Sequence, residues 1–151
     1  MNKIFKVGLI GCGHISETYF RGHDYFNNFQ IIKCADINLD NAKKCAETYG
    51  ITSCTVDDLL NDSEIEIVLN LTIPRAHYEV AKKSLDHGKH VYSEKPMAVN
   101  FEEGEELLKL ANSKSLYIGN APDTFLGGGI QKSIELINQE KIGNIRLGSA
   151  I

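Results

Sequence analysis

Short apolar runs alternate with longer amphipathic segments along almost the whole chain, and this alternation constrains the fold more than any other feature. The runs have the length and composition of buried strands. They occupy residues 4–10, 31–35, 51–55, 65–71, 90–92 and 116–118. Strands that are separated by helices form a parallel sheet with right-handed crossovers. The sequence therefore predicts a doubly wound α/β fold with a mostly parallel sheet.

The segments between these runs have the spacing of amphipathic helices, because apolar side chains recur at steps of three and four. The first such face is expected to hold Ile15, Tyr19, Gly22, Phe26 and Phe29. Further helices are expected at 42–49, at 57–60, from Pro74 to Gly88, at 101–111 and from the glycine run 127–129 onward. The final residues, 145–151, alternate like a strand that is just starting.

Composition and charge exclude several classes of protein. A chain of 151 residues with 42% hydrophobic residues fits one domain with a substantial core. A net charge of −4 argues against a general nucleic-acid-binding protein, which needs a basic surface. No apolar run is long enough to span a bilayer, and the N-terminus leads into a strand rather than a signal peptide. We expect a cytoplasmic protein that binds neither nucleic acid nor membrane.

Four cysteines raise the question of a metal site or a disulfide. They are Cys12, Cys34, Cys45 and Cys54. None forms a C-x-x-C pair, and no histidine stands at zinc-finger spacing from them. Free cysteine is among the most buried residue types. The spacing therefore predicts buried free thiols and no metal site.

A glycine-rich loop stands at the junction of the first strand and the first helix. Residues 11–16 read Gly-Cys-Gly-His-Ile-Ser, the pattern G-x-G-x-x-S. In a dinucleotide site Gly11 permits the tight turn, and Gly13 lacks the Cβ that would block a pyrophosphate. Ser16 is small enough for the helix to pack on the strand, and free N–H groups at His14 and Ile15 can face the phosphates. The loop predicts nucleotide binding and a Rossmann fold.

An acidic residue, Asp36, ends the second strand 25 positions after Gly11. A carboxylate there can accept hydrogen bonds from the ribose hydroxyls of a dinucleotide. Residues 37–39 contain no arginine for a 2′-phosphate, so NAD is favoured over NADP. A solvated or helix-capping aspartate is the alternative. These two features alone also allow a methyltransferase that uses S-adenosylmethionine.

Two longer motifs separate these possibilities. The first is T-x-P-x-x-H at residues 72–77, and the second is G-K-H-V-x-x-E-K-P at residues 88–96. With the glycine loop, Asp36 and Ile142-Gly143, they make the sequence resemble the Gfo/Idh/MocA oxidoreductases along essentially its whole length. This family includes glucose–fructose oxidoreductase and inositol dehydrogenase. The second motif is far more specific than a lone glycine loop.

The first motif follows the central strand. Thr72 and Pro74 stand at its carboxyl end, where doubly wound sheets place their ligand crevice. The resemblance implies that His77 also lines the cofactor site, whereas a histidine on the helix surface or at a helix cap is the alternative. All three are candidate cofactor-binding residues.

The second motif supplies the catalytic candidate, Lys95. A lysine at this end of the sheet can hydrogen-bond a substrate hydroxyl and stabilise the charge that develops on its oxygen. The resemblance implies that Glu94 and Lys95 lie at the cofactor, and that the Lys95–Pro96 bond is cis. Asn120 is expected near the nicotinamide. The stretch that it opens departs from the Arg- and Phe-containing one usual in the family.

The resemblance also implies a domain organisation. Residues 1–120 correspond to the NAD(P)-binding domain, residues 121–144 to a connecting loop and helix, and residues 145–151 to the first strand of a second, substrate-binding domain. The full-length protein is expected to be a homo-oligomeric dehydrogenase that acts on a sugar or polyol. The 151-residue chain alone is expected to bind cofactor with little turnover.

Two other functions stay open on the sequence. One is a regulatory nucleotide-binding module that has lost its chemistry, although an intact Glu94-Lys95-Pro96 argues against it. The other is an interaction fragment whose final strand pairs with a partner chain.

Overall fold

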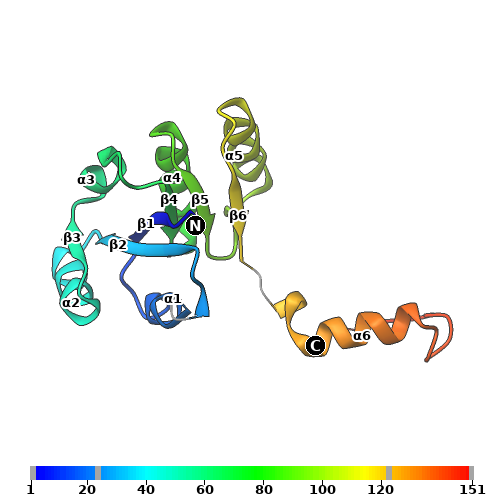
Figure 1. Ribbon diagram of the computed structural model, residues 1–151. Helices are drawn as coiled ribbons and strands as arrows, with labels where there is room; N and C mark the ends of the chain where they lie inside the picture. The colour runs from blue at the N-terminus through cyan, green and yellow to red at the C-terminus, as the bar shows by residue number, and fades with distance from the viewer. Residues whose placement is uncertain (1–2, 23–24, 122–123, 150–151) are drawn as a thin grey trace. The chain divides into compact units, whose positions relative to one another are not determined.

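A parallel sheet organises the first part of the chain (Figure 1). The computed structural model describes residues 3–22, 25–121 and 124–149, and divides into two compact units, Met1–Ala121 and Pro122–Ile151. Within the described residues the sheet has six strands in the order β3-β2-β1-β4-β5-β6, all parallel. Their bounds are β1 Phe5–Ile10, β2 Phe29–Ala35, β3 Thr52–Cys54, β4 Ile67–Asn70, β5 His90–Ser93 and β6 Ile118–Asn120. This is the predicted doubly wound fold, with the strand order of a Rossmann domain.

Helices connect the strands, and local capping sets several of their ends. Side chains of Asn38, Thr55 and Asn100 accept backbone N–H bonds at the starts of α2, α3 and α5, and Gly50 ends α2 with a φ of 66°. In the first unit the helices are α1 Ser16–Gly22, α2 Leu39–Tyr49, α3 Val56–Asn61, α4 Pro74–Asp86 and α5 Phe101–Ser113. The second unit contains the 3₁₀ turn η2 Thr124–Leu126 and the helix α6 Gly128–Asn138.

The helices cover both faces of the sheet, because successive side chains of a strand point in opposite directions. On one face Leu9 of β1 packs in a cluster with Phe20 of α1 and Cys45 of α2. On the other face Ile10, the next residue of β1, packs in a cluster with Leu59 of α3. A third cluster joins α4 and α5 to β5. The central strands β1, β2 and β4 are therefore held between two apolar layers, and polar chemistry is left to the strand ends.

The expected first helix is too long. It ends at Gly22, and Phe29 begins β2, where it pairs with Phe5 of β1. Glycine is a poor helix former, and the backbone bonds of a parallel ladder outweigh the three-and-four spacing of the two phenylalanines. Phe26 is exposed and tilts against Phe29, with ring centroids 5.9 Å apart. Phe26 and Phe29 therefore lead into β2 and do not form part of a helix face.

The expected final strand is absent from residues 145–149, the part of that segment that the structure describes. A strand needs a neighbouring backbone to complete its hydrogen bonds. The described part of the second unit contains only η2 and α6 as regular elements, so it offers no strand as a partner. The helix expected after the glycine run is confirmed as α6. The assignment of residues 145–151 to a second domain stays a prediction.

The loop between α3 and β4 is fixed by two lysines. The ammonium group of Lys89, a buried residue, donates to the carbonyl oxygens of Asp62 and Ile65 at 2.6 and 2.8 Å. The Lys33 ammonium lies 2.5 Å from a carboxylate oxygen of Asp62, and the Glu64 N–H donates to the other oxygen at 2.8 Å. Lys89, the lysine of the G-K-H-V motif, therefore stabilises this loop of the fold.

The Asp62 carboxylate should make folding sensitive to acid. Its hydrogen bond with Lys33 holds its pKa below the ordinary value of 3.8. A carboxyl whose pKa is lower in the folded chain stabilises it above the ordinary pKa, and this contribution is lost as the pH falls through the folded value. We expect Asp62→Asn to lower the free energy of unfolding by about 1 kcal/mol at neutral pH. Urea unfolding of both chains should show the difference shrinking below about pH 4; a constant difference would contradict this origin.

Candidate functional site

A cavity of about 880 Å³ opens at the carboxyl ends of the first four strands. Its wall includes Gly11 after β1, Asp36 after β2, Thr55 after β3 and Thr72 after β4, with side chains of α4 opposite. Strands β2 and β3 lie on one side of β1 in the sheet, and β4 to β6 lie on the other. The direction in which strands are added to the sheet therefore reverses at β1. Doubly wound sheets bind their ligands at this switch point.

The absence of a side chain has a different structural consequence at each of the two glycines of the loop. Gly11 has a φ of 102°, and a Cβ built on it would lie 2.6 Å from the carbonyl carbon and oxygen of Leu71. A Cβ on Gly13 would meet no atom within 4 Å. The carbonyl of Gly13 accepts bonds from the N–H and hydroxyl of Ser16. The absence of a Cβ on Gly11 therefore allows the glycine loop to contact the loop after β4, whereas its absence on Gly13 leaves open space beside the cavity.

Asp36 is held in place before any ligand arrives. One carboxylate oxygen accepts the N–H of Cys12 at 2.8 Å, and the other accepts the N–H of Asn38 at the same distance. The side chain is half-buried and lines the cavity. A carboxylate oxygen can accept more than one hydrogen bond, so both retain capacity for a hydroxyl donor.

The loop after β4 is tied to α4 by a buried polar network. The amide of Asn70 donates to the carbonyl of His77 at 2.9 Å, and its oxygen accepts the Thr72 hydroxyl at 2.6 Å. The His77 ring is fully buried, with Nε2 2.9 Å from the Thr72 carbonyl oxygen and Nδ1 2.5 Å from that of Pro96. His77 has no exposed surface and is not among the residues that line the large cavity. The His77 ring joins the loop at residues 72–74 (the T-x-P loop) to the loop at residues 94–96 (the E-K-P loop).

The E-K-P loop after β5 is also held by Glu94. Its carboxylate accepts the phenol of Tyr19 at 2.9 Å and the N–H of Lys95 at 3.1 Å. Its own N–H donates to the carbonyl of Asn70 at 2.9 Å. The amide of Asn120 donates to the carbonyls of Ser93 and Glu94 at 3.0 and 2.9 Å. Four elements, α1, β4, α4 and β6, therefore fix this loop from different sides.

Lys95 extends from this fixed backbone with its side chain exposed, and within the described part of the chain no ion pair holds it. The Lys95–Pro96 bond is cis, which confirms the expectation drawn from the resemblance. The Lys95 side chain therefore extends into solvent from a backbone that is anchored by the contacts of Glu94.

The structure separates the predicted site residues into two groups. Six line the large cavity: Gly11, Gly13, His14, Ile15, Asp36 and Thr72. Five do not: Pro74, His77, Glu94, Lys95 and Asn120. Pro74 is the exposed first residue of α4, and the other four belong to the E-K-P loop or its supports. Sequence reasoning missed Asn70 and Tyr19, because an asparagine ending a strand and a tyrosine on a helix face carry no motif.

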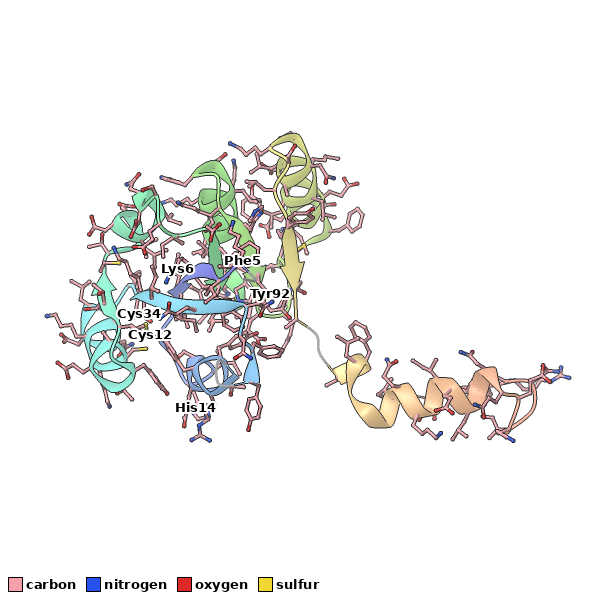
Figure 2. All side chains as sticks on the ribbon, in the orientation of Figure 1. Phe5, Lys6, Cys12, His14, Cys34 and Tyr92 are labelled. Carbon is pink, nitrogen blue, oxygen red and sulfur yellow. The ribbon has the colours of Figure 1, made fainter. Side chains whose placement is uncertain are left out.

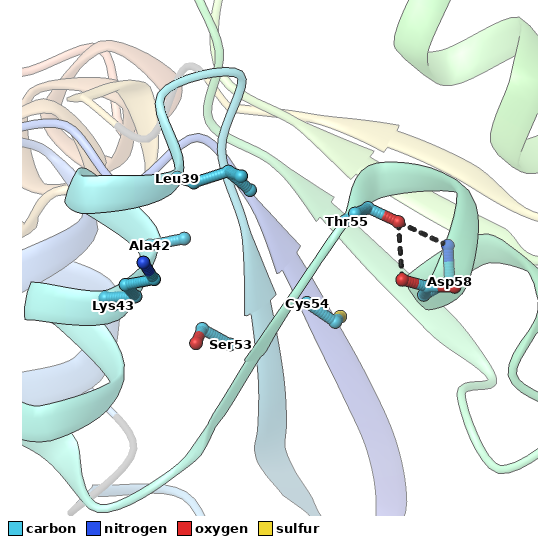
Figure 3. A pocket seen from close by; sticks show the side chains of 7 residues that line it. All are labelled: Leu39, Ala42, Lys43, Ser53, Cys54, Thr55 and Asp58. Carbon is cyan, nitrogen blue, oxygen red and sulfur yellow. Dashed lines mark hydrogen bonds between the residues drawn. The ribbon is translucent and has the colours of Figure 1, made fainter.

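A smaller cavity of about 260 Å³ lies between α2, β3 and the start of α3 (Figure 3). Thr55 and Asp58, which bond each other there, belong to the cap of α3. None of the sequence-predicted site residues lines it. The large cavity is therefore the candidate site. None of the helices in the described residues is long and apolar enough to cross a membrane.

Known proteins share this fold. The structure superposes with a TM-score of 0.87 on a 3-ketoreductase from Actinomadura kijaniata in complex with NADP, at 24% identity over 95% of this chain and 45% of that one. For biliverdin reductase from Synechocystis, in complex with biliverdin and NADP⁺, the TM-score is 0.79 and the identity 28%, over 88% of this chain and 42% of that one.

Curated relatives are similar over the same region. Glucose-6-phosphate 3-dehydrogenase of Bacillus subtilis is 34% identical over 74% of this chain and 31% of its own length. The scyllo-inositol 2-dehydrogenase (NADP(+)) of the same organism is 32% identical over 75% of this chain and 32% of its length. The chain thus spans about a third of these relatives. The family model described as "Oxidoreductase family, NAD-binding Rossmann fold" matches residues 5–120. The chain therefore belongs to the Gfo/Idh/MocA oxidoreductase family and contains its NAD-binding Rossmann domain.

Proposed function

We propose that this chain binds NAD in the large cavity and forms the coenzyme half of a dehydrogenase that acts on a hydroxyl or carbonyl carbon of a sugar or polyol. The observation that carries the proposal is the pairing of open space at Gly13 with the oriented carboxylate of Asp36 on one cavity wall. The relatives named above, a sugar phosphate dehydrogenase and an inositol dehydrogenase, support the substrate class.

The residues fit a dinucleotide. The absent Cβ of Gly13 leaves room for a pyrophosphate against the backbone, and Asp36 would accept the ribose hydroxyls. Thr72 borders the same cavity from the loop after β4. Bound there, the nicotinamide would supply the hydride donor or acceptor of the reaction.

NAD rather than NADP is the proposed coenzyme. The two N–H donors hold the negative charge of Asp36 at the cavity wall, where it would repel a 2′-phosphate. Residues 37–39 offer no arginine to offset that repulsion. The scyllo-inositol dehydrogenase named above is described as NADP(+)-dependent, and the titration below distinguishes the two coenzymes for this chain.

Lys95 is the proposed catalytic residue. Its ammonium would donate a hydrogen bond to the substrate oxygen and stabilise the charge on it during hydride transfer. The ties at Glu94, His77 and Asn120 would position it. Because the chain spans about a third of its relatives, we propose that a second domain supplies the rest of the substrate pocket, and that these 151 residues alone turn over little or no substrate.

Titration calorimetry with NADH and NADPH tests the coenzyme proposal. Wild type should bind NADH more tightly than NADPH. Asp36→Ala should weaken NADH binding roughly 10- to 100-fold, because charge-assisted hydrogen bonds contribute about 1.5–3 kcal/mol. Asp40→Ala, an exposed aspartate at the start of α2, is the matched control and should bind as wild type does. No binding of either nucleotide by wild type would refute the site, and a preference for NADPH would refute the choice of NAD.

A further inference from the structure

Three of the four cysteines meet behind the glycine loop, although they are far apart in sequence. Cys12 follows β1, Cys34 lies in β2 and Cys45 lies in α2. Their sulfur atoms all lie within 4.8 Å of one another. Figure 2 shows Cys12 and Cys34 together on the α2 side of the sheet. Cys34 is fully buried and Cys45 nearly so, whereas Cys12 is half-buried.

The sulfur spacing suits one shared ion better than a disulfide. Thiolate ligands lie about 2.3 Å from a bound ion, so three of them around one centre stand about 4 Å apart. No pair of these sulfurs therefore exceeds the spacing of a three-thiolate site by more than about 1 Å. A disulfide requires about 2.05 Å between two sulfurs and would leave the third thiol without a role. All four cysteines are free thiols in this structure.

The surroundings select a soft ion. Cys34 and Cys45 belong to an apolar cluster that includes Leu9 and Phe20, and Cys12 packs against it. Among the described residues no histidine or carboxylate joins the three sulfurs as a fourth ligand. Soft thiolates in this setting favour Cu(I) or zinc over hard cations. Structural zinc sites are almost always four-coordinate. Three sulfurs in an apolar pocket therefore match Cu(I), a d¹⁰ ion that accepts trigonal coordination.

We propose that Cys12, Cys34 and Cys45 form a three-thiolate binding site for Cu(I). Three Cu–S bonds form, three S–H bonds break and three protons are released, so no oxidant or reductant is needed. In the structure the Cys12 thiol faces the carbonyl oxygen of Ala35 at 3.6 Å, and the Cys34 thiol faces that of Ala42 at 3.4 Å. These hydrogen bonds are weak, so breaking them on metal binding would cost little. The site does not depend on the proposed coenzyme function.

The experiment is an anaerobic titration of the reduced chain with Cu(I) buffered by a chromogenic chelator. Wild type should bind one equivalent, and X-ray absorption should show three sulfur ligands per copper. Cys12→Ser and Cys45→Ala should each weaken Cu(I) binding by more than the roughly 10- to 100-fold that loss of an outer-shell partner costs, since each removes one of the three bonds to the ion. Cys54→Ser is the matched control, because its half-buried thiol lies outside the triad, and it should bind as wild type does.

Circular dichroism and thermal melts of each variant separate loss of the site from loss of the fold. Cys12→Ser is the decisive variant, because its side chain lies in a half-buried loop rather than in the core. The proposal is overturned if folded wild type binds no stoichiometric Cu(I), if copper has fewer than three sulfur ligands, or if Cys54→Ser weakens binding as much as folded Cys12→Ser. NADH titration of the same samples is independent, so failure of the copper site leaves the coenzyme proposal untouched.

Discussion

Replacing Gly11 by alanine is expected to lower the free energy of unfolding by at least about 3 kcal/mol. The new Cβ would stand 2.6 Å from the backbone of Leu71 and 2.8 Å from the N–H nitrogen of Thr72. These are main-chain atoms of the neighbouring loop and cannot rotate away, as a side-chain end could. The φ of 102° adds strain for any residue with a Cβ. Urea unfolding followed by circular dichroism measures the loss.

Gly13→Ala is the matched control, and it separates stability from binding. Its Cβ would enter open space, so the free energy of unfolding should change by no more than about 0.5 kcal/mol. The methyl group would instead occupy the space proposed for the pyrophosphate, and we expect NADH affinity to fall at least about tenfold. Equal stability losses in the two variants would contradict the structural distinction between the glycines. Unchanged NADH binding by Gly13→Ala would contradict the placement of the pyrophosphate.

The second large effect is expected at His77. His77→Leu keeps much of the buried volume but leaves the carbonyl oxygens of Thr72 and Pro96 without their ring partner. Because a neutral imidazole donates only one N–H bond, the substitution leaves at least one buried carbonyl without its donor and should cost about 1–3 kcal/mol. The same change frees the E-K-P loop from α4, so that its backbone should become more mobile.

Two measurements test this role. Urea unfolding gives the stability loss, and hydrogen exchange should show faster exchange at Lys95 and in the neighbouring loop residues. His87→Ala is the control, because that exposed histidine contacts one carbonyl of its own helix and should change stability by about 0.5 kcal/mol or less. If His77→Leu proved as mild as His87→Ala, the ring would not be the link between the two loops.

Much of the fold could be predicted because strands buried on both faces leave an unmistakable apolar pattern. The run at 4–10 and the glycine that follows it place the first strand and its turn, and Asp36 could be placed because a motif spacing relates it to Gly11. The spacing predicts too long a first helix, because Phe26 and Phe29 continue the steps of three and four beyond Gly22. Only pairing with Phe5 assigns Phe29 to a strand, and that contact is tertiary.

The site was harder to predict than the fold, because its supports depend on contacts between distant segments. The family resemblance predicts His77 at the cofactor, whereas the structure shows a buried ring that contacts the carbonyls of two loops. Asn70 carries no motif, and its role comes from facing the start of α4. The cysteine triad is invisible in sequence spacing because a sheet and a helix bring its members together.

The backbone that carries Lys95 is closed entirely within the first unit. Its last tie comes from Ala121, whose N–H donates to the Ser93 carbonyl at 3.0 Å where that unit ends. A chimera that fuses residues 1–121 to another domain would therefore retain the support of the Lys95 loop. The position after residue 121 is accordingly a point at which the chain can be divided without removing any of the contacts that hold this loop.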